Sequence, residues 1–172
     1  MSNKRLSDLP VAVSLDGSEY FEVVQGGTSK RATAQQIGET GLPGAIPTAL
    51  GILIDYGTNV VQAGVQGSIT VPFDCTLTSV TMLANTSGSV EVDVWKCSYT
   101  QYDGFSTHPA SGDSICGGTP PAISSTTKYK NTTLTGWGTT FAEGDIIAFN
   151  VTGTATSINK LTVSLHVDRT VV

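Results

Sequence analysis

The residues best suited to chemistry lie together in one polar stretch in the second half of the chain. Tyr99, Tyr102 and Phe105 supply three aromatic rings, and Asp103 lies among them. Flat rings flanked by carboxylates and amides can stack on a sugar and hydrogen-bond its hydroxyls. With His108, these three aromatic residues are the candidates for binding a surface glycan or a receptor. The alternative, which stays open, is that the rings cover the end of a β-domain or meet a neighbouring subunit.

The sequence contains no recognisable catalytic constellation. Of its two histidines, only His108 has carboxylates nearby, Asp103 and Asp113. A hydrolytic dyad or a metal site would need a third partner at a fixed spacing, and the sequence supplies none. The second histidine, His166, falls on the expected outward face of the last strand. We therefore expect a protein that is not an enzyme, with no cofactor and no catalytic or metal-binding residues.

Three cysteines, Cys75, Cys97 and Cys116, are too few for a disulfide framework. The simplest interpretation is buried thiols, because free cysteine packs like a small hydrophobic residue. A Cys97–Cys116 bridge that closes the intervening loop is an open alternative. Zinc bound by Cys97, Cys116 and His108 is disfavoured, because the spacings match no known ligand pairing.

The composition excludes several classes of partner. The net charge is −5 and the pI is near 4.8, and the basic residues occur singly or in pairs, which argues against a nucleic-acid partner. No apolar run approaches the roughly 18 residues of a membrane helix, so we expect no membrane insertion. Lys4 and Arg5 are not followed by an apolar segment, so we expect no secretory signal and synthesis in a cytoplasm.

The elements that would position these residues are strands, and Ser89–Lys96 is the clearest. Its three valines, Val90, Val92 and Val94, alternate with larger polar or aromatic residues. This two-residue period indicates a strand with one buried and one accessible face. The Asn-Thr-Ser-Gly sequence at Asn85–Gly88 predicts a turn before it.

Similar strand signals recur at short spacing from residue 51 onward, and no helical periodicity competes with them. A long polar loop, 98–121, interrupts the series. About eight short strands with turn-rich connections predict an all-β domain over 51–172, an antiparallel β-sandwich of the jelly-roll kind. The clearest strands are expected at 52–56, 68–73, 76–84, 89–96, 128–134, 145–151 and 160–168.

The first 40 residues form a small module of their own. Strands are expected at 19–24 and 29–34, joined by a turn over Gln25–Thr28, with one helical turn at 33–38. Such a β-hairpin has too few apolar residues to be stable alone, so it must dock on its own copies or on a partner. Residues 41–50, with two prolines and two glycines, are predicted to be a linker.

Motifs in both parts resemble virion proteins of tailed bacteriophages, namely tail fibres, head fibres and related surface proteins. The N-terminal motifs resemble the attachment module that opens many such proteins, and the remaining motifs resemble their β-domain. In that family the region of the 98–121 loop varies, so this loop inherits no role. The motifs are Leu6-Ser-Asp-Leu-Pro10, Leu15-Asp-Gly17, Val23-Val-Gln-Gly-Gly-Thr28, Ile69-Thr-Val-Pro-Phe73, Gly88–Lys96, Leu134-Thr-Gly-Trp137, Gly144-Asp145 and Leu161-Thr-Val-Ser-Leu165.

The resemblance implies a non-enzymatic virion protein, a homotrimer anchored by its N-terminal module and displaying the β-domain outward. The partner would be the major capsid protein or another virion protein. Because the sequence has no extended shaft, our leading hypothesis is a capsid decoration (cement) or head-fibre protein. The alternative is a short tail fibre that recognises a host-surface glycan through the 98–121 loop. The residues expected to anchor the protein are Lys4, Arg5, Leu6, Leu9, Pro10, Tyr20, Phe21 and Val23.

Overall fold

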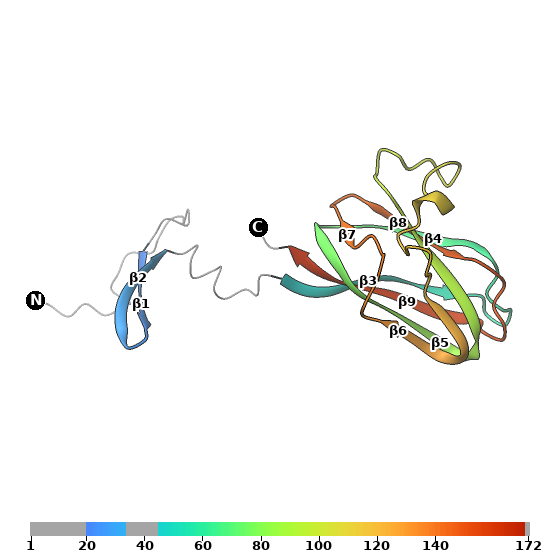
Figure 1. Cartoon of the computed structure of the whole chain (residues 1–172), viewed down its shortest axis with the longest axis horizontal. Helices are drawn as coiled ribbons and strands as arrows, with labels where there is room; N and C mark the ends of the chain where they lie inside the picture. The colour runs from blue at the N-terminus through green and yellow to red at the C-terminus, as the bar shows by residue number, and fades with distance from the viewer. Residues whose placement is uncertain (1–19, 34–44, 171–172) are drawn as a thin grey trace, which may run out of the picture. The chain divides into compact units, whose positions relative to one another are not determined.

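The computed structural model describes residues 20–33 and 45–170 (Figure 1). The chain divides into two compact units, Met1–Gly44 and Ala45–Val172. The described residues are nearly all in strands or their connections, with a 3-10 helix η2 (Ser111–Asp113) as a short exception. The predicted all-β fold is therefore confirmed. None of the helical structure in the described ranges has the length and apolar character needed to span a membrane.

The described part of the first unit is an antiparallel hairpin of β1 (Tyr20–Gln25) and β2 (Thr28–Thr33). Gly26 and Gly27 join the strands and have φ values of 61° and 76°. A two-residue turn with positive φ at both positions favours glycine, which explains why the Gly-Gly pair folds the chain back here. The predicted hairpin is confirmed, whereas the helical turn expected at 33–38 lies largely outside the described residues.

The second unit is built around one path of antiparallel strands in the order β3-β9-β5-β8-β4, with β6 and β7 also paired to β5. The eight-stranded jelly-roll arrangement stays a prediction. The strands of this unit are β3 (Ala45–Asp55), β4 (Gly64–Thr70), β5 (Cys75–Cys97), β6 (Ala122–Asn131), β7 (Thr140–Phe141), β8 (Ile146–Val151) and β9 (Lys160–Thr170).

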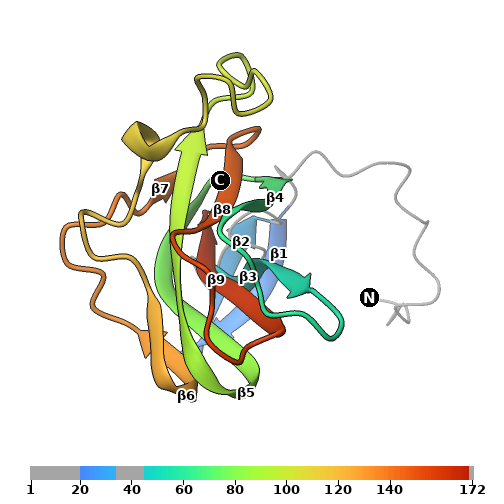
Figure 2. The ribbon, with the colours of Figure 1, turned by 90° about the vertical axis from the view of Figure 1, so that its right-hand side faces the viewer.

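Strand β5 holds the unit together, because it pairs with β9 along one part of its length and with β8 along another. Its first half, Cys75–Ala84, pairs with β9, and its last part, Val92–Cys97, pairs with β8. Figure 2 shows β5 as one long curved strand with β6 beside it. The turn predicted at Asn85–Gly88 is wrong: these residues lie within β5. The pairing with β6 shifts register between Leu83 and Gly88, so the irregularity that resembles a turn is a bend in a continuous strand.

The linker predicted at 41–50 ends earlier than expected, because β3 begins at Ala45. Pro47 lies inside this strand, opposite Asp168 of β9. A proline cannot donate a ladder hydrogen bond, but β3 is the first strand of the path and pairs along it only with β9. The edge position therefore allows a strand where two prolines predicted a linker.

The core lies where the alternating patterns placed it. Val90, Val92 and Val94 are buried, as predicted for the inward face of the 89–96 segment. The alternate residues of β9 are also buried, and the 145–151 segment is buried almost throughout, as expected for a strand covered on both faces. The buried β9 residues are Leu161, Val163, Leu165 and Val167.

All three cysteines, Cys75, Cys97 and Cys116, are buried and free. This confirms the interpretation as buried thiols and excludes the Cys97–Cys116 bridge in this structure. Burial raises the pKa of all three thiols, and it raises the pKa of Cys116 to about 12. Thiols of this kind are poor nucleophiles at neutral pH.

Candidate functional site

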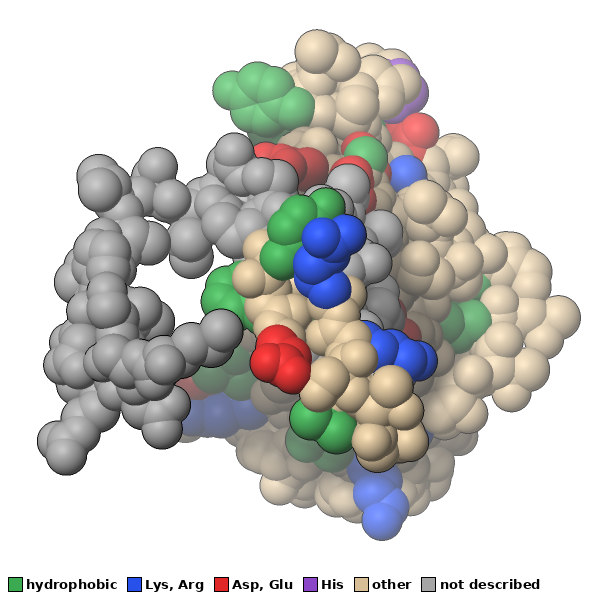
Figure 3. Space-filling model, turned by 90° about the vertical axis from the view of Figure 1, so that its left-hand side faces the viewer, with side chains coloured by type: hydrophobic (Ala, Val, Ile, Leu, Met, Phe, Trp, Pro, Cys, Tyr) green, Lys and Arg blue, Asp and Glu red, His purple; other side chains and the backbone are tan. Residues whose placement is uncertain are grey.

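The hairpin exposes apolar side chains that a stable protein would normally bury. Tyr20, Phe21 and Val24 are 61%, 42% and 74% exposed. Successive residues of a strand point to opposite faces, so Tyr20 and Phe21 place an aromatic ring on each face of the hairpin. In Figure 3, hydrophobic side chains lie at the surface close to Lys and Arg side chains. A two-stranded hairpin with an exposed aromatic ring on each face is a surface suited to docking.

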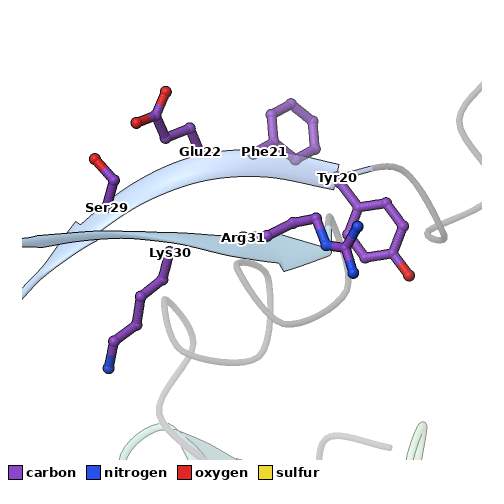
Figure 4. A pocket seen from close by; sticks show the side chains of 6 residues that line it. All are labelled: Tyr20, Phe21, Glu22, Ser29, Lys30 and Arg31. Carbon is purple, nitrogen blue, oxygen red and sulfur yellow. The ribbon is translucent and has the colours of Figure 1, made fainter.

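Arg31 completes this surface by stacking on Tyr20. Its guanidinium carbon lies 4.1 Å from the centroid of the Tyr20 ring (Figure 4). The contact follows from the register, because Arg31 is opposite Glu22 and therefore diagonal to Tyr20 on the same face. A cation over a tyrosine ring is attractive and keeps the ring in place. Around this pair is a hollow of about 320 Å³, lined by Tyr20, Phe21, Glu22, Ser29, Lys30 and Arg31.

The structure describes three of the eight predicted anchoring residues. Tyr20 and Phe21 lie on β1 and are exposed, as an anchoring role requires. Val23 also lies on β1, opposite Lys30. Arg31 was not among the predicted anchoring residues, although the expected hairpin register places it beside Tyr20. The other predicted anchoring residues, Lys4, Arg5, Leu6, Leu9 and Pro10, lie outside the described residues.

The second candidate surface is the 98–121 loop, which follows β5. Asp103 organises the first part of the loop. Its carboxylate accepts hydrogen bonds from the backbone N–H groups of Ser106, Thr107 and His108, with N···O distances of 2.9–3.0 Å. These hydrogen bonds, led by those from Thr107 and His108, lower the pKa of Asp103. Asp103 therefore shapes the loop, whereas the sequence analysis treated it as part of a glycan-binding set.

His108 is held by a second carboxylate. Its Nδ1 lies 2.9 Å from Asp113 Oδ2, and the same oxygen accepts the N–H of Ala110 at 2.8 Å. Burial of Asp113 opposes its ionisation, but the hydrogen bonds from Ala110 and His108 outweigh it, and the pKa of Asp113 is lowered. His108 is half-buried and stabilises the loop through Asp113, so it is less available to bind a ligand than the sequence suggested.

The structure brings two of the three predicted aromatic residues together. The rings of Tyr102 and Phe105 meet edge to face, with centroids 5.4 Å apart and planes at 85°. Phe105 is half-buried, whereas Tyr102 and Tyr99 are exposed. Tyr102 is supported by Phe105, and both Tyr99 and Tyr102 are exposed, as the glycan-binding interpretation requires.

Acid should loosen this loop. The pKa values of Asp103 and Asp113 lie below 3.8, so both carboxylates stabilise the loop above that pH, and the stabilisation is lost as the pH falls through their lowered pKa values. We expect the NMR amide signals of Thr107 and His108 to shift as the pH falls below 3.8. In Asp103→Ala the same signals should already be displaced at neutral pH. Signals of the unmodified protein that stay constant throughout the titration would contradict this assignment.

Comparison with known proteins does not identify a family. No protein-family model matches the chain, and no match was found among curated proteins. In the part of the chain that the structure describes, no group of three or more His, Cys, Asp or Glu side chains could hold a metal ion.

Proposed function

We propose that this chain is a non-enzymatic structural protein of a bacteriophage virion, a capsid decoration or head-fibre protein. The observation that carries the proposal is the hairpin β1–β2, which exposes Tyr20, Phe21 and Val24. The hairpin is the attachment element, and the β-domain that follows it is the part displayed outward.

The energetics of the hairpin support an attachment role. A two-stranded hairpin is at best marginally stable in water. Fully burying one large apolar side chain contributes about 1.5–3 kcal/mol, so docking Tyr20, Phe21 and Val24 on a partner would stabilise the hairpin and the attachment together. The Arg31 guanidinium, stacked on Tyr20, would meet a carboxylate or carbonyl group of the capsid surface.

The sequence resemblance supports the same role for the whole chain. Its N-terminal motifs include the turn Val23–Thr28, which lies within the described hairpin. The proposed assembly is a homotrimer within the virion. Its partner is the major capsid protein or another virion protein, and the proposed function involves neither nucleic-acid binding nor membrane insertion.

Immunogold electron microscopy of intact virions tests the proposal. Antibody against this protein should place gold over the heads of phage particles that carry it. Addition of purified protein to virions that lack it should restore the gold label. The Phe21→Ser/Val24→Ser protein should restore several-fold less label, because its docking surface has lost two apolar side chains. A Tyr99→Ser variant, altered at an exposed aromatic residue of the other unit, should bind like the unmodified protein. Virions free of gold would refute the proposal.

One observation favours the alternative, a short tail fibre that binds a host glycan. Tyr99 and Tyr102 are exposed on the 98–121 loop, where flat rings could stack on a sugar. Gold confined to the tail tip would favour this function over decoration. In that case Tyr102→Ala should weaken adsorption to host cells without altering virion assembly.

A further inference from the structure

The exposed face of the sheet region formed by β3, β9, β5 and β6 has no role in the attachment just proposed. We infer that copies of this chain associate through it, with Leu53 of one copy packing against Leu83 of the next. The inference rests on the proposed assembly of several copies, and it assigns that assembly to particular side chains.

The two leucines lie in one row across the sheet, on either side of Thr162. Leu53 on β3 and Leu83 on β5 are 65% and 54% exposed, and both lie opposite Thr162 of β9 in the strand register. They therefore point to the same face, two strand spacings or about 10 Å apart. Two exposed leucines on one sheet face, with only Thr162 between them, depart from the polar residues that a solvated face normally carries.

On the side away from Asp55, the rows of β3, β9 and β5 next to the leucines carry no carboxylate, lysine or arginine. One row consists of Gly51, Ser164 and Thr81, and in the following row His166 lies opposite Ala49 and Ser79. The ring of His166 is 3.0 Å from Thr81 Oγ1, so its polar group is engaged within the face. Short side chains make this region flat, which suits close approach of another sheet.

On this face the charged residue of β3 and those of β6 differ in sign. Asp55 is the only charged residue of β3, next to Leu53 on the same face, and its partner Lys160 lies 3.0 Å away on β9. Strand β6 carries Lys128, opposite Leu83, and Lys130, and no acidic residue. The exposed Asp55 carboxylate accepts the Gly57 N–H at 2.8 Å and pairs with Lys160, and its remaining lone pairs can accept further donors.

This arrangement of leucines and charges fits a second copy of the chain. If the β3 margin of one copy lies over the β5–β6 margin of the next, Leu53 meets Leu83 and Asp55 approaches Lys128. Figure 2 allows the reader to follow β3, β9, β5 and β6 in this order across the sheet.

Light scattering on the full-length protein across micromolar concentrations tests the inference. The unmodified chain should show a multimeric mass. Leu53→Ser and Leu83→Ser should each raise the concentration at which it dissociates by about tenfold or more. Tyr99→Ser, which also removes an exposed apolar side chain, is the matched control and should not change it. Because both leucines are exposed, thermal unfolding of the variants should stay close to that of the unmodified protein.

A cross-linking experiment tests the pairing itself. An equal mixture of Leu53→Cys and Leu83→Cys proteins should form cross-linked dimers under oxidation, and the native cysteines should not interfere because they are buried. A monomeric mass, a multimer unaffected by both leucine substitutions, or absence of 53–83 cross-links would overturn the inference. If gold labels the virion heads but any of these results is obtained, the attachment function stands and only this inference fails. If the protein is a multimer in solution but virions carry no gold, only the attachment function is refuted.

Discussion

Replacing Gly88 by alanine should destabilise the second unit by about 3 kcal/mol or more, one of the largest single-residue effects we expect. A Cβ atom at this position would overlap the backbone carbonyl oxygen of Thr156 and lie 2.8 Å from Ile158 Cγ1. Thr156 cannot retreat easily, because its N–H donates to the Ser89 carbonyl at 2.9 Å and its carbonyl accepts the Ser89 N–H at 3.3 Å. Relief of the clash would have to break this bridge or move the bend of β5.

Thermal unfolding measures the effect, and Gly153→Ala is the matched control. Gly153 belongs to the connection that also contains Thr156, but a Cβ there would meet no atom within 4 Å. We expect Gly88→Ala to lower the melting temperature by roughly 6–12 °C and Gly153→Ala to leave it nearly unchanged. Equal melting temperatures for the two variants would show that the bend does not depend on a glycine.

Replacing Phe149 by alanine should cost about 3–5 kcal/mol. The Phe149 side chain is fully buried at the centre of β8, opposite Gly67 of β4 and Val94 of β5. Its removal loses the free energy of burying the ring and leaves a cavity that the paired strands on either side cannot readily fill.

Urea unfolding followed by tryptophan fluorescence measures this loss. Tyr99→Ala, which removes an exposed ring, should change the free energy of unfolding by about 0.5 kcal/mol or less. If the slope of the free energy of unfolding against urea concentration is unchanged, the effect of Phe149→Ala is on the stability of the native state. If both variants unfold at the same urea concentration, Phe149 is not a core residue and the sheet pairing around it is wrong.

The strands were largely predictable, because alternating valines and leucines have few other uses. The 89–96 and 160–168 segments both fold as that pattern indicates. The failure at Asn85–Gly88 has a physical reason: asparagine, serine and glycine favour turns locally. Here pairing with β9 up to Ala84, and with β6 at Leu83 and Gly88, holds the strand extended across the segment. Local propensity could not report the distant strands that decide the outcome.

The candidate surfaces were predictable in part. Exposed aromatic residues at Tyr20, Phe21, Tyr99 and Tyr102 follow from composition and expected position in strands or loops. The structural role of Asp103 does not, because it depends on where three backbone N–H groups point. The row formed by Leu53 and Leu83 could not be foreseen either, since only their common neighbour on β9 brings them together.

The pairing of β3 with β9 also constrains how the unit can form during synthesis. Ala45 lies opposite Thr170, so the first strand of the unit pairs with the last strand that the structure describes. Strand β5 likewise depends on β9 for its first half. On the ribosome the earlier strands therefore emerge without their partner, and the larger sheet cannot close until β9 has left the exit tunnel. A fold dominated by such distant pairings forms slowly, so β3 and β5 remain open to wrong partners throughout translation.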